Sequence, residues 1–459
     1  MNYLVNTPCG PVQGCAGRQP GVAAYKGIRY ATAGRWEYPQ QVTHWDGVYQ
    51  ATRYGSCCYQ PRSFYDEETY AKKYFYYHEF RKNSGYEYTY SEDCLFLNVF
   101  APADATPESK LPVLFYIHGG GFTGGCGHEK HFDGPVWPTK GVIAVTINYR
   151  LGPLGFCTLP ELEAEAGRTG NYGLFDQVCA LQWVRDNIAA FGGDASRVTI
   201  MGQSAGAMSV QQLCMSPLTK GLFAGAVMSS GGGISKVLSA KPARNNYAFW
   251  QQVMHNAGCA TLADFRALPV EKLFQVWQDG KKAIKGGASG HSPCIDGELI
   301  VAAGTDAVAS GLQHRIPYLT GSTSHDMMSP ILFKMSHDWC RVQAEQGGPA
   351  AYCWMFDRKM PGDGTGAWHS SDLWYWFGTL ENGWRPFTEK DHRISEEMVQ
   401  YLANFAATGN PNGGGLPEWQ PIAKNQSKVL RVGEAATHMG KASLLKLAGI
   451  MLTTKSVGE

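Results

Sequence analysis

Several short stretches of the chain are largely apolar instead of alternating between apolar and polar positions. Such runs are typical of strands buried on both faces of a sheet. They occupy residues 95–100, 113–117, 142–149, 198–201 and 316–321. Because stretches of helical character separate several of these runs, the pattern predicts an α/β fold with a mostly parallel central sheet and helices on both faces.

Apolar residues recur at helical spacing in other parts of the chain. Residues 176–191 have this spacing and are followed by Gly192, which predicts an amphipathic helix that stops there. A second amphipathic helix is predicted over residues 392–408, ending at Gly409, and residues 240–315 also have helical character. These segments supply the helices that the predicted sheet requires.

The first 30 residues contain turn signals and short β-type runs, which predict an N-terminal β meander. No stretch of the chain has the composition of a linker, and we find no repeat or low-complexity segment. We therefore expect one domain over residues 1–459, with helical insertions.

Composition narrows the classes of partner. The 459 residues are 44% apolar, and their 40 basic and 39 acidic side chains are mixed along the chain, for a net charge of +1. This balance argues against a nucleic acid or an anionic membrane as partner. No apolar run is long enough to span a bilayer, and the N-terminal residues do not resemble a signal peptide, so we expect a cytoplasmic location.

The 13 cysteines are scattered over the whole chain and are odd in number, unlike the framework of a small disulfide-rich protein. Most are expected to be buried thiols. None has the spacing of a metal site in the sequence. Cys57 and Cys58 are adjacent, and Cys94 lies downstream of them.

The clearest chemical signal is the pentapeptide 202–206, in which Ser204 stands between glycines. It follows an apolar β-type run and precedes a helix-like one. This context is typical of a nucleophile elbow, where a tight strand-to-helix turn lifts a serine hydroxyl clear of the sheet. The helix N-terminus also places backbone N–H groups beside the serine. Without that context, the pentapeptide would be only a small-residue turn.

A glycine-rich segment, 119–124, follows another predicted strand and formally matches a dinucleotide-binding loop. No good helix start follows it, and no acidic residue ends the next strand, which argues against that interpretation. We interpret it as an oxyanion loop, with the backbone N–H groups of Gly120, Gly121 and Ala205 as donors. His118 is expected to hold the loop and not to act as a base.

A serine nucleophile requires a base and a carboxylate that orients it, in the chain order serine, acid, histidine. Asp326 follows the predicted strand 316–321, and His369 lies in a loop, so these are our candidates. His325 is a rival base, but neighbouring residues rarely face one cleft. His392 and His438 are expected on the surface.

Two other features leave alternatives open. His128 and His131 suggest a metal site but lack the spacing of a zinc-binding helix, so we interpret them as surface or loop histidines and expect no metal. Residues 61–90 are rich in tyrosine and phenylalanine. They form either a surface excursion packed on the domain or an aromatic wall of a ligand cleft.

The order of these motifs resembles the type-B carboxylesterases, the cholinesterase-like branch of the α/β-hydrolase fold. The resemblance runs nearly from end to end. The segments that carry it are residues 92–98, 118–122, 170–177, 180–184, 191–194, 202–206, 229–231, 296–297, 321–326, 366–369 and 404–411.

The resemblance implies roles for single residues. Ser204 falls at the nucleophile position, His369 at the base and Asp326 at the acid, where the family usually has glutamate. Ser230 matches a serine near the acid, and Gln203 stands beside the nucleophile where many members have glutamate. A further implied pair is the ion pair between Arg35 and Glu92, and Cys94 matches a cysteine that secreted members pair with one matching Cys58 or Cys57.

The implied function is hydrolysis of small to medium, neutral or aromatic carboxylic esters through an acyl-enzyme, without metal or cofactor. A serine amidase or peptidase would use the same triad. A non-catalytic binding protein of this fold is a further alternative, but such proteins lack the serine. We expect a monomer or a weak homo-oligomer whose partner is a small-molecule ester.

Overall fold

The computed structural model of the protein describes residues 3–64, 88–283, 290–362, 364–434 and 436–453. Within these residues, the largest sheet has 11 strands. In spatial order they are β20 (Thr437–Gly440), β19 (Val429–Val432), β18 (Ala351–Phe356), β17 (Tyr318–Thr323), β14 (Gly225–Ser229), β13 (Gly193–Gln203), β11 (Leu111–Ile117), β12 (Ile143–Ile147), β10 (Phe96–Pro102), β4 (Val22–Arg29) and β3 (Cys15–Ala16).

The strands from β12 to β19 in this order run parallel to one another, whereas the pairs nearer both edges of the sheet are antiparallel. This is the mostly parallel sheet that the apolar runs predict. Alternate residues of β11 explain those runs, because Val113 and Phe115 belong to one buried cluster while Leu114 and Tyr116 belong to another. A strand between two cores is apolar on both faces.

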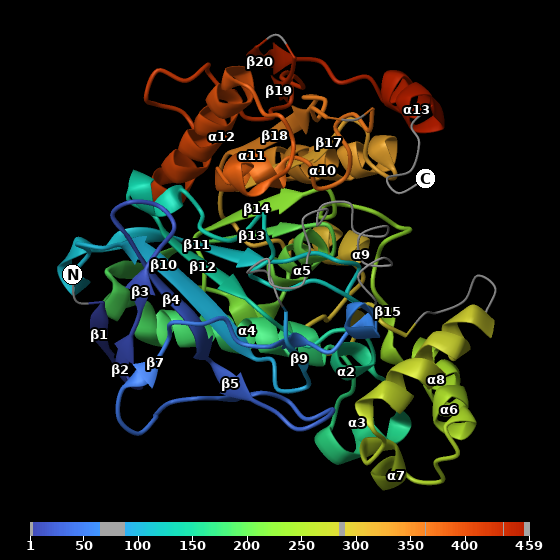
Figure 1. Ribbon diagram of the computed structural model, residues 1–459. Helices are drawn as coiled ribbons and strands as arrows, with labels where there is room; N and C mark the ends of the chain where they lie inside the picture. The colour runs from blue at the N-terminus through green and yellow to red at the C-terminus, as the bar shows by residue number, and fades with distance from the viewer. Residues whose placement is uncertain (1–2, 65–87, 284–289, 363, 435, 454–459) are drawn as a thin grey trace.

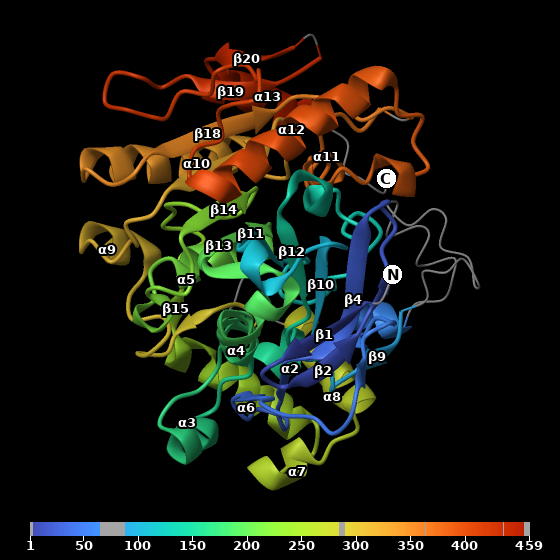
Figure 2. The same cartoon turned by 90° about the vertical axis from the view of Figure 1, so that its left-hand side faces the viewer.

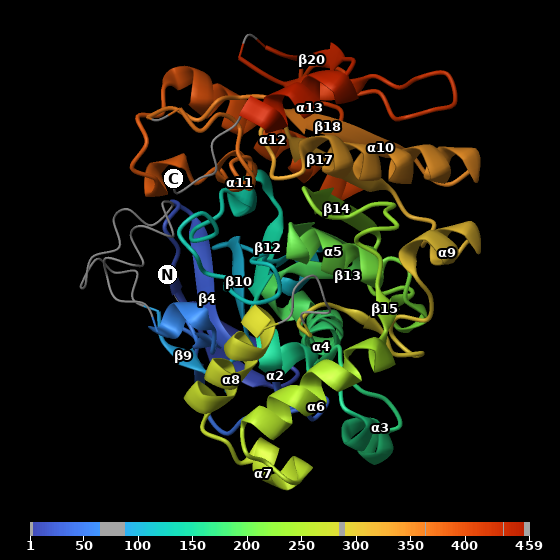
Figure 3. The same cartoon turned by 90° about the vertical axis from the view of Figure 1, so that its right-hand side faces the viewer.

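Helices cover both faces of the sheet (Figures 1–3). Helices α4, α5 and α10 contribute to one core, and α11 and α12 contribute to the other. Helices α6, α7 and α8 gather at the end of the molecule opposite β20 and α12 (Figures 1 and 3). The helices are α2 (Gly152–Phe156), α3 (Pro160–Ala166), α4 (Tyr172–Asn187), α5 (Ala205–Leu213), α6 (Tyr247–Asn256), α7 (Leu262–Arg266), α8 (Val270–Ala283), α9 (Gly304–Ala309), α10 (Ser329–Glu345), α11 (Leu373–Phe377), α12 (Glu389–Thr408) and α13 (Leu444–Thr453).

The N-terminal strands form the predicted antiparallel pairs, with one addition. β1 (Leu4–Thr7) pairs antiparallel with β2 (Gly10–Gln13), but the third strand of that small sheet, β7 (Tyr49–Gln50), is parallel to β2. The remaining short strands are β5 (Ala31–Thr32), β6 (Gln40–Gln41), β8 (Cys57–Cys58), β9 (Tyr90–Ser91), β15 (Lys241–Pro242) and β16 (Cys294–Ile295).

The helix expected over residues 176–191 differs from the prediction. α4 begins earlier, at Tyr172, and a short 3-10 turn over Ile188–Phe191 completes it. Most of its residues are buried, because α4 lies between the large sheet and the N-terminal strands β5 and β6. Polar side chains such as Asp176 are therefore internal partners and not the exposed face of an amphipathic helix. The second expected helix is confirmed as α12, and Gly409 ends it in a left-handed conformation.

None of the helices in the described segments combines the length and the apolar character needed to cross a bilayer.

Candidate active site

Ser204 stands at a sharp turn between β13 and α5. Its φ of 56° lies in the left-handed region, which a non-glycine residue rarely adopts. A Cβ on Gly202 would lie 2.3 Å from the backbone of Gly206, and one on Gly206 would lie 2.1 Å from the carbonyl oxygen of Ile117. Both flanking positions therefore require glycine, as the elbow interpretation predicts.

The glycine-rich segment is held beside this turn by the sheet. β11 is parallel to β13 with Ile117 opposite Gly202, so the loop that follows β11 emerges next to the elbow. A Cβ on Gly119 would approach the Ser204 Cβ to 3.1 Å. Gly120 and Gly121 have φ values of 105° and 63°. In the part of the chain that the structure describes, no helix starts on this loop, which agrees with the argument against a dinucleotide site.

The glycine-rich loop and the first residue of α5 offer backbone hydrogen-bond donors. Among the described residues, the backbone N–H groups of Gly120, Gly121 and Ala205 donate to no other backbone group. His118 holds the start of the loop, because its Nδ1 lies 2.8 Å from the Gly119 carbonyl oxygen and its ring stacks on Tyr149. Burial lowers the pKa of His118 to about 4, so this imidazole is neutral at pH 7.

The histidine and the acid come from two loops that the backbone ties together. His325 N–H donates to the Ala367 carbonyl oxygen at 3.0 Å, and this link brings Asp326 close to His369. His369 Nδ1 donates to Asp326 Oδ1 at 2.5 Å. His325 lines a different pocket, next to Asp357, so it is separated from Ser204 as expected.

The electrostatics of this pair favour a charged acid and a basic histidine. Burial alone would raise the pKa of Asp326, but the neighbouring His369 and hydrogen bonds, including one at 2.9 Å from the Met327 N–H, lower it. Burial likewise opposes the charged form of His369, yet the charge and hydrogen bond of Asp326 raise its pKa above the ordinary value. Ser230 also lowers the pKa of Asp326, although its buried Oγ makes no hydrogen bond of normal geometry with a described residue.

Gln203 makes a contact that the sequence does not reveal. The side chain is buried, and its Nε2 lies 3.1 Å from His369 Nε2. Since Nδ1 of that histidine carries the proton donated to Asp326, Nε2 has the lone pair and accepts from Gln203. The amide of Gln203 therefore faces the nitrogen that a serine nucleophile would use.

Ser204, Gln203 and His369 open into one cavity of about 400 Å³. Its walls are mostly apolar and aromatic, which is typical of a small-molecule site. Wall residues beyond the elbow, the glycine loop and His369 include Pro61, Arg62, Glu129, His131, Phe132, Met327, Trp368, Leu373 and Trp374.

Comparisons with known proteins agree with this geometry. A model described as the carboxylesterase family matches residues 2–347 and 325–446. The para-nitrobenzyl esterase of Bacillus subtilis (strain 168) is 32% identical over an alignment that covers 90% of this chain and 91% of that protein.

This chain belongs to the carboxylesterase family.

More distant relatives support the same assignment. Liver carboxylesterase 1 of Oryctolagus cuniculus is 28% identical, over 90% of this chain and 86% of its own length. The solved structure of a thermophilic PNB esterase superposes with a TM-score of 0.83 at 26% identity, covering 97% of this chain and 100% of the other. The protein is a carboxylic ester hydrolase with the α/β-hydrolase fold.

A second buried carboxyl group, that of Asp372, lies near the triad candidates of this carboxylesterase. The prediction from the sequence did not include it. Asp372 lies fully buried three residues after His369 and accepts a hydrogen bond of 2.7 Å from Ser229 Oγ. Burial, with the nearby charge of Asp326, raises the pKa of Asp372 to about 6. Its position only three residues after His369 in the sequence was the available signal.

The histidines at 128 and 131 correct another expectation. Both lie in a loop, but neither is on the surface, because His128 is 6% exposed and His131 is 8% exposed. Aromatic contacts explain their burial, since His128 stacks on Tyr54 and His131 packs against Phe132 and Trp374. The other two histidines expected on the surface, at positions 392 and 438, are exposed.

The aromatic stretch at 61–90 lies mostly outside the described residues, which omit 65–87, so its two interpretations stay open. The cavity has other aromatic walls, formed by Phe132, Trp368 and Trp374. Glu129, which the sequence did not single out, is also in the wall, where Arg62 forms an ion pair with it.

Two pairs implied by the family resemblance can be located. Arg35 Nε donates to Glu92 Oε2 at 2.9 Å, which confirms the ion pair. All 13 cysteines are free thiols in this structure, including Cys58 and Cys94. The hydrogen bond between these two thiols raises the pKa of Cys94. Cys58, and not Cys57, is therefore the cysteine next to Cys94.

Proposed function

We propose that this carboxylesterase cleaves its substrate through an acyl-enzyme formed on Ser204, with His369 as general base and Asp326 as the acid that orients it. The observation that carries the proposal is the 2.5 Å hydrogen bond between His369 and Asp326, made by a histidine that shares one cavity with Ser204. That bond keeps the proton on Nδ1 and leaves Nε2 as the acceptor.

In the first step, Ser204 Oγ attacks the ester carbonyl while its proton passes to His369 Nε2. The carbonyl oxygen becomes an oxyanion, and the free N–H groups of Gly120, Gly121 and Ala205 are the proposed donors to it. Gln203 competes for the same lone pair of His369 at 3.1 Å, so we expect its amide to give way when a substrate is bound.

When the oxyanion intermediate collapses, His369 gives the proton to the leaving alcohol, the bond between the carbonyl carbon and the alcohol oxygen breaks, and the acyl-enzyme remains. In the second half of the reaction, water attacks the acyl-enzyme while His369 takes a proton from it. His369 then gives that proton to Ser204 Oγ as the acyl bond breaks, which releases the acid and regenerates Ser204. All of these proton transfers use side chains of this chain.

The cavity favours small to medium esters that are neutral or aromatic. A volume of about 400 Å³ lies at the low end of ligand pockets, and the aromatic walls suit flat apolar groups. Glu129 is ionised, since Arg62 and His131 outweigh its burial and lower its pKa to about 2. The paired Arg62 guanidinium cancels most of the attraction that this carboxylate would exert on a cationic alcohol group.

We therefore predict no preference for choline esters. A choline ester and its uncharged carbon isostere, with the same acyl group, should have kcat/KM values within a few-fold of each other. A ratio of the two kcat/KM values above about tenfold in favour of the choline ester, equivalent to ~1.4 kcal/mol, would show that the cavity contains a cation-binding group and would contradict this prediction.

The amidase alternative is tested with matched leaving groups. We expect a p-nitrophenyl ester to be hydrolysed with a far higher kcat/KM than the corresponding p-nitroanilide, since the proposed triad must protonate a much poorer leaving group in the amide. Equal values would favour an amidase, and no turnover of either substrate by folded protein would favour a binding protein of this fold.

The remaining properties are also proposals. We propose that residues 1–459 act as one catalytic domain with helical insertions, as a monomer or weak homo-oligomer. A cytoplasmic location is supported by the free thiols of its 13 cysteines, which persist in reducing compartments.

A further inference from the structure

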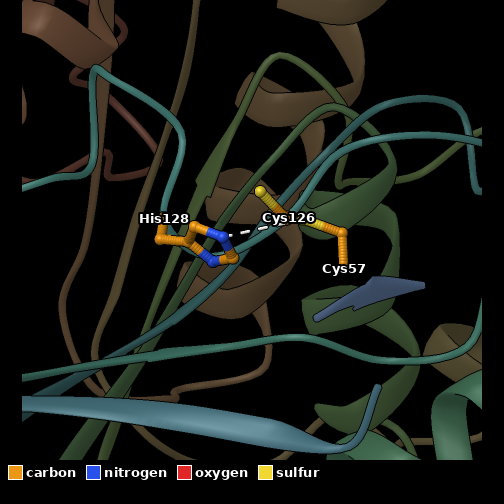
Figure 4. A group of neighbouring side chains, drawn as sticks. All are labelled: Cys57, Cys126 and His128. Carbon is orange, nitrogen blue, oxygen red and sulfur yellow. Dashed lines mark hydrogen bonds between the residues drawn. The ribbon is translucent and has the colours of Figure 1, made fainter. Parts of the chain in front are cut away.

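Three side chains with soft donor atoms meet behind the glycine-rich loop. Cys57 lies on β8, while Cys126 and His128 lie on the segment that continues the loop after β11. Figure 4 shows the imidazole of His128 turned toward the two cysteine side chains. Cys57 lies 71 residues before His128 in the sequence, so no spacing rule reveals the cluster.

The separations match those around a metal ion. The two Sγ atoms and one ring nitrogen all lie within 4.8 Å of one another, and Cys57 Sγ is 3.6 Å from His128 Nε2. A tetrahedral zinc ion with bonds of ~2.3 Å to sulfur and ~2.05 Å to nitrogen would place such atoms about 3.6 Å apart. The cluster therefore needs little rearrangement to enclose an ion.

The surrounding structure fixes the three positions. Cys57 N–H donates to the Thr89 carbonyl oxygen at 2.8 Å, and the N–H of Gly127 donates to Asn148 Oδ1 at 2.8 Å. The His128 ring stacks on Tyr54 with centroids 4.5 Å apart. Donor atoms held in place before binding lose little entropy when an ion arrives.

All three side chains are buried, since Cys57 is 1% exposed, Cys126 2% and His128 6%. Thiolates are the form in which cysteines bind metals.

We propose that Cys57 Sγ, Cys126 Sγ and His128 Nε2 bind one thiophilic divalent ion of the zinc class, with water in the fourth position. Two thiolates neutralise a divalent charge, whereas a monovalent ion would leave a net negative charge in a buried site. The ion would join β8 to the glycine loop, and Gln60 already makes a parallel connection by bonding both Gly125 N–H and Gly125 O. The role of the bound ion is structural, and the proposal does not depend on the catalytic roles of Ser204, His369 and Asp326.

The test is zinc binding by the full chain after reduction, chelation and desalting. Calorimetry should find one zinc per chain, and zinc should raise the Tm. Cys126→Ser and Cys57→Ser should each weaken binding at least about a hundredfold, since even changes to residues around the ligands cost 10–100-fold. Cys259→Ser, which removes a half-buried thiol elsewhere, is the matched control and should bind zinc like the unaltered protein.

Cobalt supplies a readout that does not depend on the variants folding. Co²⁺ added to the unaltered protein should produce a thiolate-to-metal charge-transfer band, and zinc should abolish it by displacement. The proposal is overturned if the reduced protein binds no zinc, if cobalt produces no thiolate band, or if Cys126→Ser binds zinc as tightly as Cys259→Ser. Recovery of a Cys57–Cys126 disulfide that, once reduced, still takes up no metal would instead identify a redox pair.

Discussion

Replacement of Ser204 by alanine is expected to lower kcat for a p-nitrophenyl ester by on the order of a millionfold. The loss is large because the acyl-enzyme cannot form, and the remaining residues supply only binding and oxyanion stabilisation. The fold should persist, since the Ser204 side chain is half-exposed and its strained φ is held by Gly202 and Gly206. The measurement is kcat on freshly purified protein, with thermal unfolding as the control.

Retention of more than a few per cent of activity by the Ser204→Ala protein would contradict the assignment. His325→Gln provides a matched comparison, because His325 lines a different pocket, together with Asp357. That variant should keep its activity, whereas His369→Gln should lose it.

The second large effect is expected from Asp326→Asn, which should lower kcat by roughly ten-thousandfold. An amide at this position favours the wrong tautomer of His369, because it can donate to Nδ1 where the carboxylate accepts from it. Glu298→Gln is the matched control, since Glu298 is paired with Arg168 away from the cavity, and this variant should be fully active.

The pH dependence of Asp326→Asn gives a second readout. His369 must be neutral to accept a proton, so activity falls as the pH drops through its pKa. Asp326 raises that pKa, which places the acid limb of kcat/KM for the unaltered enzyme above the ordinary histidine value of about 6.5. Without the carboxylate the charged imidazole is less stable, so the residual activity should have its acid limb at lower pH.

An unchanged limb, or full activity in Asp326→Asn, would show that another group acts as the acid. Asp372 is then the residue to replace, because it is buried and its charge also raises the pKa of His369.

The sequence predicts those features that depend on local chain geometry. The elbow requires glycine at 202 and 206 because the backbones touch, and the alternation of two cores along β11 produces a continuous apolar run. Both effects arise within a few residues, so the printed sequence is enough to recognise them.

Features that depend on packing between distant segments are not visible in this way. The predicted amphipathic character of residues 176–191 was wrong because N-terminal strands cover the outer side of α4. His128 and His131 are buried by Tyr54 and Trp374, which come from other parts of the chain. Which of His369 and His325 faces the cavity likewise depends on how two loops pack. The sequence favoured His369 as the base, and it is His369 that lines the cavity of Ser204 while His325 lines another pocket.

The most direct test of the central claim is the site of covalent labelling by a p-nitrophenyl phosphonate, which traps the nucleophile with release of p-nitrophenol. Intact-mass analysis should find one phosphonyl group per chain, and peptide mapping should locate it on Ser204. Labelling should vanish in Ser204→Ala and slow strongly in His369→Gln. A label on any other residue, or an unmodified Ser204 in fully inactivated enzyme, would contradict the account.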